Sequence, residues 1–230
     1  MQAANTGLTG GSTPNGDNYD RQIVIINTMR VNSIQIINEG NQIIGFSGST
    51  LFGLEKKLEK FNREPHSVIG SSCIGASIVG GVCNNSGGAL VKRGPAYTEL
   101  SLYAQIEPDG KLSLVNDLGI DLGDTPEEIL TNLENKNYTK SQIQFPDKSA
   151  SDKEYKKRIR EVDASTPARF NADERRLYAA SGCAGKIGVF AVRLDTYQKP
   201  KRSAVFYVGS KKSFVFGQIR KDILSKFKTF

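Results

Sequence analysis

A glycine-rich block in the first half of the chain constrains the fold most strongly. Six glycines fall in the 19 residues from Gly70 to Gly88, among serines and asparagines. Residues 65–91 carry no Lys, Arg, Asp or Glu and are long enough to span a bilayer, but their Gly, Ser and Asn content excludes a transmembrane helix. The glycines have no collagen-like period and are too localised for a flexible linker. The block therefore predicts backbone that approaches a neighbour or a ligand closely.

A second glycine-rich stretch opens the chain. Four glycines lie among the first 16 residues, again with Asn, Thr and Ser between them. Such loops are suited to anions, because consecutive backbone N–H groups can converge on a phosphate and hydroxyls add donors. Neither stretch has the G-x-x-x-x-G-K-[ST] pattern of a P-loop, and no G-x-G-x-x-G follows a strand. The two loops favour a bound dinucleotide or similar phosphate ligand, with tight turns as the alternative.

Composition and charge narrow the class of protein. The 230 residues allow one large domain or a domain and a half. With 38% hydrophobic and 24% charged residues, the chain is globular rather than disordered or fibrous. The net charge is +7, and residues 198–230 hold nine basic residues and one acidic residue, so that segment carries +8 and the rest −1. The segment is either a solvated surface strip or a surface for an anionic membrane or another polyanion.

Several kinds of site are disfavoured. The three cysteines, Cys73, Cys83 and Cys183, form no C-x-x-C pair, and His66 is the single histidine, so a zinc site is not expected. Small buried thiols in a reducing compartment are the simpler interpretation. A Ser-His-Asp triad would need His66, and no nucleophile elbow is present. Tryptophan is absent and no stacking pattern occurs, so no nucleic-acid partner is expected. No signal peptide opens the chain, which predicts a soluble or peripheral protein.

Hydrophobic periodicity predicts strands and helices in mixed order. Strands are expected at residues 22–27, 31–37, 42–46, 99–106, 111–115, 187–194 and 204–208, with turns at 38–41 and 108–110 that make two hairpins. Helices are expected at residues 50–61, 172–180 and 213–227 and from Thr125 onward, with a weaker signal at 76–82. Thr125, Pro126 and Glu128 form a capping-box start. Residues 136–164 are polar and predict an inserted surface excursion. Because the expected strands and helices do not alternate strictly along the chain, the sequence favours an α+β fold.

Four motifs, in order and spacing, carry a family resemblance. Residues 5–12 read NTGLTGGS, and residues 63–88 read REPHSVIGSSCIGASIVGGVCNNSGG. Residues 93–99 read RGPAYTE, and residues 181–190 read SGCAGKIGVF. This series resembles the FAD-binding domain of the vanillyl-alcohol-oxidase (PCMH-type) flavoprotein superfamily, and within it the bacterial quinone-dependent D-lactate dehydrogenase family. The resemblance covers essentially the whole chain, and the motif at residues 65–88 is specific to a family rather than to a fold.

The resemblance implies an α+β fold in which a two-subdomain PCMH-type FAD-binding domain, incomplete at both ends, is followed by the first βα unit of a cap domain. Residues 1–197 would form the FAD-binding domain and residues 198–230 the start of the cap. Full-length members of the family also have a complete cap over the flavin and a basic membrane-binding region. The chain is therefore expected to be a fragment whose missing flanks complete the fold.

The resemblance also implies which residues contact FAD. On the first loop and the glycine-rich block they are Ala3, Ala4, Asn5, Thr6, Gly7, Gly11, Ser12, Gly70, Ser77 and Gly87, and on a later strand Val189. The first loop and Gly70 suit the pyrophosphate, where close backbone approach matters. No covalent-flavin attachment motif is present, so FAD is expected to bind non-covalently. His66 is expected near the flavin, with a packing or hydrogen-bonding role favoured over a catalytic one. No metal site is expected.

The implied reaction is transfer of a hydride from the carbinol carbon of D-lactate to FAD, giving pyruvate, with electrons passed on to a membrane quinone. A base would take the hydroxyl proton and a cation would hold the carboxylate. Family members bind anionic lipid peripherally at the cytoplasmic face of the bacterial inner membrane. Their catalytic groups come largely from the cap, so the catalytic residues here are unassigned and the isolated chain is expected to be inactive. The alternatives are a flavin dehydrogenase of another 2-hydroxy acid and a non-catalytic polyanion-binding module that uses the basic segment.

Overall fold

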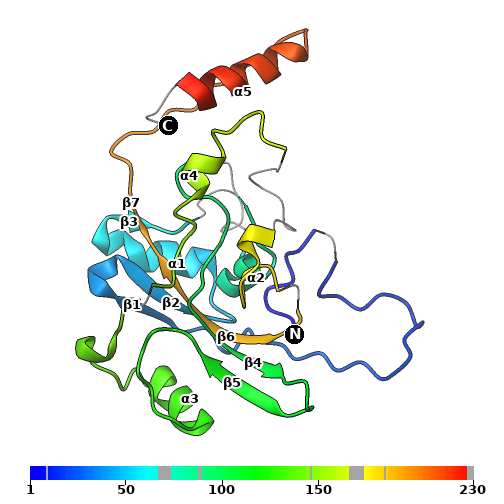
Figure 1. Ribbon diagram of the computed structural model, residues 1–230, viewed down its shortest axis with the longest axis vertical. Coiled ribbons are helices and arrows are strands. Elements are labelled where there is room, and N and C mark those ends of the chain that lie inside the picture. The colour runs from blue at the N-terminus through cyan, green and yellow to red at the C-terminus, as the bar shows by residue number, and fades with distance from the viewer. Residues whose placement is uncertain are drawn as a thin grey trace.

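A five-stranded antiparallel sheet forms the centre of the computed structural model, which describes residues 1–8, 10–66, 74–87, 90–145, 147–165, 174–183 and 185–226 (Figure 1). The strand order is β1-β2-β6-β4-β5. The strands of this sheet are β1 (Ile34–Ile37), β2 (Gln42–Phe46), β4 (Ser101–Ile106), β5 (Leu112–Asn116) and β6 (Gly188–Asp195). A smaller antiparallel pair joins β3 (Arg63–Glu64) to β7 (Tyr197–Gln198).

The two predicted hairpins are confirmed. In β1–β2, Ile36 lies opposite Ile43, and the connection turns through Asn38 and Glu39 with positive φ angles of 49° and 54°. In β4–β5, the turn contains Gly110 at φ 84°, a conformation that glycine adopts without steric cost. The long predicted strand at residues 187–194 is β6, which pairs with β2 on one side and with β4 on the other. The two hairpins are thus joined into one sheet by β6, which lies much later in the sequence.

Helices cover both faces of the sheet. On one face lie α1 (Leu51–Leu58) and α2 (Ile78–Cys83), whose buried residues share a core with Ile43. On the other face lies α3 (Pro126–Glu134), which shares a second core with Ile44. Because side chains alternate along a strand, these neighbouring isoleucines of β2 serve the two cores. This arrangement of an antiparallel sheet with packed helices confirms the α+β prediction.

Threonine caps begin α1 and α3. Thr50 accepts a hydrogen bond from the Gly53 N–H at 3.1 Å, and α1 continues into the 3-10 turn η2 (Glu59–Phe61), which matches the predicted helix at residues 50–61. Thr125 and Glu128 form the predicted capping box of α3. The remaining short elements are η1 (Asn38–Gly40), η3 (Lys140–Gln142), α4 (Tyr155–Arg158) and η4 (Glu174–Arg176).

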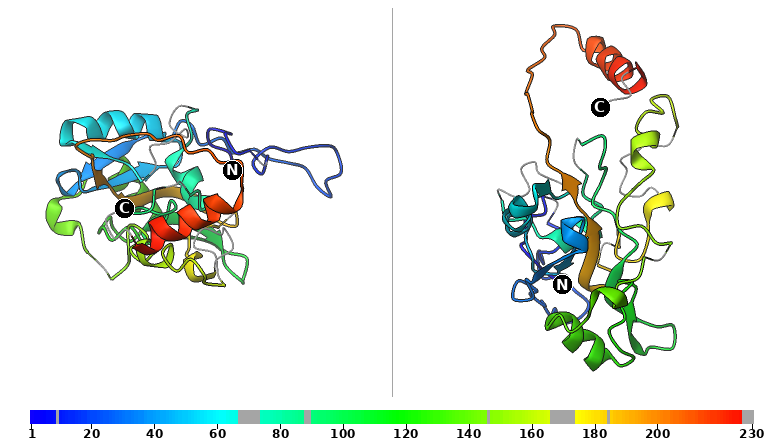
Figure 2. Two further views of the ribbon diagram at one scale, coloured as in Figure 1. Left: turned by 90° about the horizontal axis from the view of Figure 1, so that it is seen from above. Right: turned by 90° about the vertical axis from the view of Figure 1, so that its left-hand side faces the viewer.

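The last helix, α5 (Phe214–Lys226), lies apart from the sheet at the end of an extended connection (Figures 1 and 2). It rests against the segment around residue 160, because Arg160 Nη1 donates to the Leu224 carbonyl at 3.0 Å and Lys221 pairs with Asp163 at 2.9 Å. Leu224 is its buried residue. The predicted helix at residues 213–227 is confirmed as far as Lys226. In the described part of the chain, no helix combines the length and apolarity needed to cross a bilayer.

Two predicted strands are wrong. Residues 22–27 form no strand; Asn27 alone makes a single parallel bridge, to Gln2, and Val24 is 80% exposed. Residues 204–208 are extended but unpaired, and Phe206 is 82% exposed. β-branched and aromatic runs become strands only when a neighbouring strand satisfies their backbone groups, and neither run is paired along its length in the structure. The predicted βα unit after residue 198 therefore has its helix but not its strand.

Two further expectations need correction. Of the helix predicted at residues 172–180, the described part contains only the 3-10 turn η4, followed by a tight turn in which Tyr178 pairs with Ser181. The segment at residues 136–164 is not merely a surface excursion, because Asp152 is 4% exposed and Tyr155 is fully buried. The Tyr155 ring packs directly on Gly94, a contact between distant segments that local pattern does not encode.

Candidate functional site

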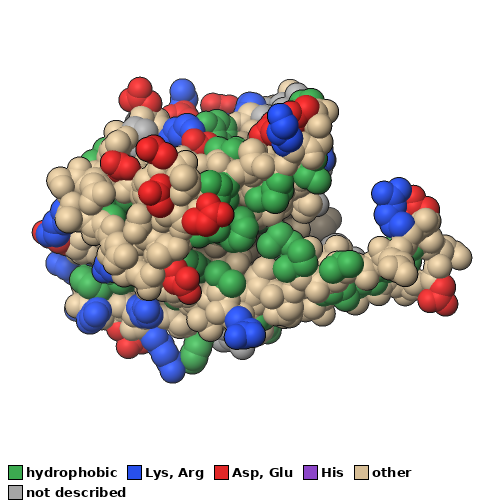
Figure 3. All heavy atoms as spheres, turned by 90° about the horizontal axis from the view of Figure 1, so that it is seen from below, with side chains coloured by type: hydrophobic (Ala, Val, Ile, Leu, Met, Phe, Trp, Pro, Cys, Tyr) green, Lys and Arg blue, Asp and Glu red, His purple; other side chains and the backbone are tan. Residues whose placement is uncertain are grey.

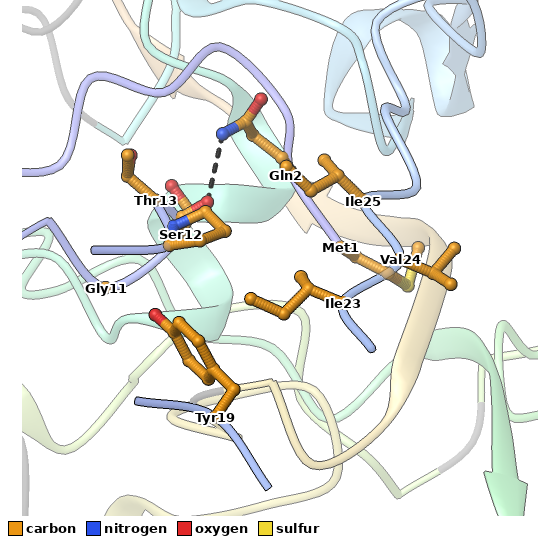
Figure 4. Close-up of a pocket in the computed structure, with 10 residues that line it drawn as sticks. Met1, Gln2, Gly11, Ser12, Thr13, Tyr19, Ile23, Val24 and Ile25 are labelled. Atoms are coloured by element: carbon orange, nitrogen blue, oxygen red, sulfur yellow. Dashed lines mark hydrogen bonds between the residues drawn. The ribbon is translucent and has the colours of Figure 1, made fainter. Parts of the chain in front are cut away.

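The first loop is closed at its base by backbone hydrogen bonds. The Gln2 N–H donates to the Ile26 carbonyl, and the Gln2 carbonyl accepts from the Thr28 N–H, both at 2.9 Å. The side chain of Gln2 then donates to the Ser12 carbonyl at 2.9 Å, the dashed contact in Figure 4. This second contact folds the glycine-rich stretch back over the base of the loop.

Asn5 organises the inside of this loop. Its backbone adopts a left-handed φ of 53°, and its Oδ1 accepts hydrogen bonds from Ser12 Oγ at 3.0 Å and Thr13 Oγ1 at 2.8 Å. Two residues that were predicted to contact FAD, Asn5 and Ser12, are thereby held together. An added Cβ at Gly7 or Gly11 would meet nothing within 4 Å, so the backbone at both positions is open to a close approach. Sequence reasoning did not identify Asn5 as the hydrogen-bonding centre.

A cavity of about 270 Å³ lies beside the loop. Figure 4 shows its two sides, one polar and one largely apolar. The lining residues are Met1, Gln2, Gly11, Ser12, Thr13, Pro14, Tyr19, Ile23, Val24 and Ile25. The volume is near the lower end of the roughly 300–1,000 Å³ typical of small-molecule sites, enough for part of a dinucleotide. These lining residues include no acidic side chain that would repel a phosphate by charge.

The loop beyond the cavity projects from the body of the protein. Figure 3 shows hydrophobic side chains along the part of this arm nearest the body and charged side chains at its tip. The hydrophobic ones include Ile23, Val24, Ile25 and Ile26, which are between 46% and 80% exposed. Asp20 and Arg21 form an exposed ion pair at 2.7 Å.

The described part of the glycine-rich block is tied to the sheet through α2. Ser77 caps this helix, its hydroxyl oxygen accepting from the Gly80 N–H at 3.2 Å, and it is only 6% exposed. Ser77 thus has a clear structural role in addition to its predicted contact with FAD. Gly87 is exposed just beyond the helix. Gly70 lies outside the described residues.

The segments that were predicted to contact FAD lie near one another at the start of β6. Val189 is 3% exposed and its side chain is in the core, so only its backbone could face a ligand. A Cβ on the preceding Gly188 would come within 3.2 Å of Met1 Sδ, which places the first loop against this strand. The loop leading into β6 contacts α2, because the Gly182 N–H donates to the Val82 carbonyl at 3.0 Å. The structure therefore brings the first loop, α2 and Val189 to one region.

His66 is buried and does not suit acid–base catalysis at neutral pH. Burial, together with the positive charge of Arg93, lowers the pKa of His66 to about 4, so its imidazole is neutral at pH 7. A base whose pKa is so far below the working pH transfers protons poorly, and a neutral ring holds no carboxylate by charge. These properties agree with the packing role favoured from the sequence.

The sequence alone did not show that Arg93 and Glu64 are the charged neighbours of His66. Arg93 donates to the Pro65 carbonyl at 2.7 Å, pairs with Glu64 and stacks at 4.8 Å over the Tyr197 ring. Glu64 precedes and Arg93 follows the uncharged residues 65–91, and this placement could have indicated that the two residues pair. Across the described ranges, no cluster of three or more His, Cys, Asp or Glu side chains is placed to bind a metal ion.

Comparison with known proteins shows what the chain is similar to. The chain is 60% identical over 227 residues to a quinone-dependent D-lactate dehydrogenase of Haemophilus influenzae and 56% identical over 228 residues to one of Escherichia coli K12. A quinone-dependent D-lactate dehydrogenase of Corynebacterium glutamicum is 44% identical over 223 residues. The chain is similar to a segment of quinone-dependent D-lactate dehydrogenases. The resemblance inferred from the four motifs is thus confirmed.

The similar region covers nearly all of this chain but less than half of each relative. The alignments cover 97–99% of this chain but only 39–40% of each quinone-dependent D-lactate dehydrogenase. The chain therefore spans about 40% of the length of these curated relatives. No protein-family model matches the chain.

Proposed function

We propose that this chain is the main flavin-binding part of an FAD-dependent dehydrogenase that oxidises D-lactate to pyruvate and passes the electrons to a quinone. The observation that carries the proposal is the 60% identity over nearly the whole chain to a quinone-dependent D-lactate dehydrogenase. The open glycine-rich loop beside the cavity supports it, since backbone approach at such loops suits a pyrophosphate. We propose in addition that the fold is of the PCMH type with two subdomains.

The domain boundary is proposed at residue 197. Up to that point the chain forms the five-stranded sheet and the packed helices, and the boundary falls within the short strand β7, which pairs with β3. Residues 199–213 are exposed throughout, and α5 follows them away from the sheet. Residues 1–197 would be the FAD-binding domain and residues 198–230 the start of a cap.

The proposed FAD contacts fit the geometry of the first loop. Backbone at Ala3, Ala4, Thr6, Gly7 and Gly11 would surround the pyrophosphate, and the amide of Asn5 would keep Ser12 in place. Gly70, Ser77, Gly87 and the backbone of Val189 are proposed to contact the rest of the cofactor. Bound FAD would supply the hydride acceptor, and no covalent link to the chain is proposed.

The proposed partners are D-lactate, a membrane quinone and an anionic lipid surface, with peripheral attachment at the cytoplasmic face of the bacterial inner membrane. The exposed basic residues of the segment 198–230 favour contact with anionic lipid, which attracts Lys and Arg at about 1 kcal/mol each near the surface. The same segment would serve a polyanion-binding module, but such a module requires no flavin. Flavin binding therefore separates the two functions.

The test compares two asparagines that share a backbone conformation. Asn5 and Asn62 both have φ of 53°, so Asn→Gly is free of strain at either position. Asn5→Gly removes the acceptor for Ser12 and Thr13 and should weaken FAD affinity about tenfold or more, as expected for two lost hydrogen bonds of about 1 kcal/mol each. Asn62→Gly, at the end of η2, should bind FAD like the wild type. Quenching of flavin fluorescence measures both.

Equal FAD affinity in the two variants would mean that the first loop is not part of the FAD site. No FAD binding by the wild type would favour the polyanion-binding module.

Acid precipitation of the FAD complex should leave all flavin in the supernatant, and flavin in the pellet would contradict non-covalent binding. A chain of the relatives' full length should reduce a quinone analogue with D-lactate rather than L-lactate. Preference for a longer 2-hydroxy acid would instead support the alternative substrate. The 230-residue chain alone should show no such activity.

A further inference from the structure

Two cysteines that lie 100 residues apart in the sequence meet between α2 and the loop before β6. Cys83 is the last residue of α2, and Cys183 follows the turn at Tyr178–Ser181. The residues directly before them are joined, since the Gly182 N–H donates to the Val82 carbonyl at 3.0 Å. Both thiols are free, and both pack in the same core, with Cys183 9% exposed and Cys83 half-buried.

The surroundings of the two sulfur atoms differ. The two cysteine side chains are neighbours in this core, and each shifts the ionisation of the other. The neighbouring Cys83 thiol and nearby backbone N–H groups lower the pKa of Cys183, which favours its thiolate. The same contact and burial raise the pKa of Cys83. Cys183 is therefore the member of the pair that ionises first.

We propose that Cys83 and Cys183 are an oxidation site that closes to a reversible disulfide linking α2 to the loop before β6. A thiolate in contact with a second thiol is the arrangement from which disulfides form, whereas an isolated buried cysteine is inert. Disulfides need Cα atoms about 4.4–6.8 Å apart. The backbone hydrogen bond between the preceding residues and the core that both cysteines share bring the pair together.

Hydrogen peroxide is small enough to reach the nearly buried Cys183 thiolate. The sulfur attacks one peroxide oxygen, the O–O bond breaks, and the products are a sulfenic acid and hydroxide. The sulfur of Cys83 then attacks the sulfenic sulfur, the S–O bond breaks, and the proton of Cys83 leaves with the hydroxyl as water. In total, two thiols and one hydrogen peroxide give one disulfide and two waters, with two electrons passing from sulfur to peroxide.

The site is independent of the proposed function but lies beside it. Cys83 precedes Gly87 on one segment, and Cys183 precedes Val189 on the other, so the disulfide would fasten together two segments proposed to contact FAD. In a reducing compartment the pair would remain as thiols and close only under oxidative conditions. The cross-link would close a loop of 100 residues between Cys83 and Cys183, and the oxidised chain should unfold at a higher temperature than the reduced one.

Peptide mapping tests the assignment directly. The folded chain is treated with hydrogen peroxide, blocked with N-ethylmaleimide, digested with trypsin and examined by mass spectrometry. The expected product joins the peptide of residues 64–92 to that of residues 177–186 and separates on addition of dithiothreitol. Because residues 64–92 contain both Cys73 and Cys83, Cys73→Ser is the matched control and should keep the link. Cys83→Ser should lose it and leave a sulfenic acid on Cys183 that dimedone traps.

Three results would overturn the proposal. The link could persist in Cys83→Ser, disappear in Cys73→Ser, or fail to form in the wild type while Cys183 is oxidised. A measurement on the wild type needs no variant: iodoacetamide at pH 7 should alkylate Cys183 faster than Cys83, because the thiolate is the nucleophile. Equal rates would contradict the assigned thiolate. Circular dichroism checks that each variant is folded, and Cys83→Ala replaces Cys83→Ser if the serine variant is not.

Discussion

Gly94 shows how a single side-chain contact depends on the absence of a Cβ atom. Its φ is +71°, and an added Cβ would lie 2.6 Å from Cγ of the buried Tyr155 ring. Gly94→Ala should therefore suffer both backbone strain and overpacking, and we expect it to lower the free energy of unfolding by about 2–4 kcal/mol. Urea titration followed by circular dichroism measures the change.

Gly110 is the matched control for this prediction. Its φ is +84°, but a Cβ there would meet nothing within 4 Å. Gly110→Ala should lower the free energy of unfolding by only about 1 kcal/mol, the cost of the backbone conformation alone. Similar losses in the two variants would show that the Tyr155 contact does not limit position 94.

His66 should make stability depend on pH in a defined range. Its pKa falls from 6.5 in the unfolded chain to about 4 in the folded protein, because burial and Arg93 disfavour the charged form. The unfolded state therefore binds a proton that the folded state does not between these pH values, so stability is full above pH 6.5 and falls as the pH drops toward 4. At pH 5 the loss from this residue should be about 2 kcal/mol relative to pH 7.

His66→Gln isolates this contribution, because glutamine does not titrate. Urea midpoints at pH 7 and pH 5 should differ more for the wild type than for the variant, with the gap equal to the histidine contribution. An identical pH dependence in both proteins would mean that folding does not lower the pKa of His66.

At the scale of elements, α3 depends on its capping box. Thr125 Oγ1 accepts from the Glu128 N–H at 3.3 Å, and Glu128 Oε2 accepts from the Thr125 N–H at 3.0 Å. Thr125→Ala removes the first bond and loosens the second, which should lower the free energy of unfolding by about 1 kcal/mol. Thr131→Ala, at an exposed position in the same helix, should change it by less than about 0.5 kcal/mol. Thermal unfolding compares the two, and a larger effect at Thr131 would contradict the cap.

At the scale of the whole molecule, Arg193 connects β6 to distant parts of the chain. Its guanidinium donates to Gln42 Oε1 at 2.7 Å and to the carbonyls of Leu118 and Gln144 at 3.1 and 2.9 Å, and the residue is 1% exposed. Arg193→Met would leave these acceptors buried without a donor. We expect a loss of at least about 3 kcal/mol, since each orphaned acceptor costs about 1–3 kcal/mol.

Arg202→Met is the control for Arg193, because Arg202 is exposed in the connection before α5. It should leave the urea midpoint nearly unchanged, with an effect below about 0.5 kcal/mol. A small effect at Arg193 as well would show that water replaces the guanidinium at the buried carbonyls.

The candidate site was only partly predictable from the sequence. The motifs identified the proteins to which the chain is similar, and they identified the first loop, which the structure closes beside a cavity. They did not identify Asn5 as the acceptor for Ser12 and Thr13, or the packing of Cys83 and Cys183 in one core. Those contacts join residues whose spacing in the chain has no fixed relation to their distance in space.

The sequence by itself determined the local elements: both hairpins, α1, α3 and α5, because turn residues, caps and the period of apolar side chains act within a few residues. Only the tertiary structure decided that β6 enters between β2 and β4, that Tyr155 is buried against Gly94, and that the apolar runs at residues 22–27 and 204–208 stay unpaired. A strand requires a partner for its backbone groups and a buried side chain requires a surface to pack on. Both are supplied by distant parts of the chain.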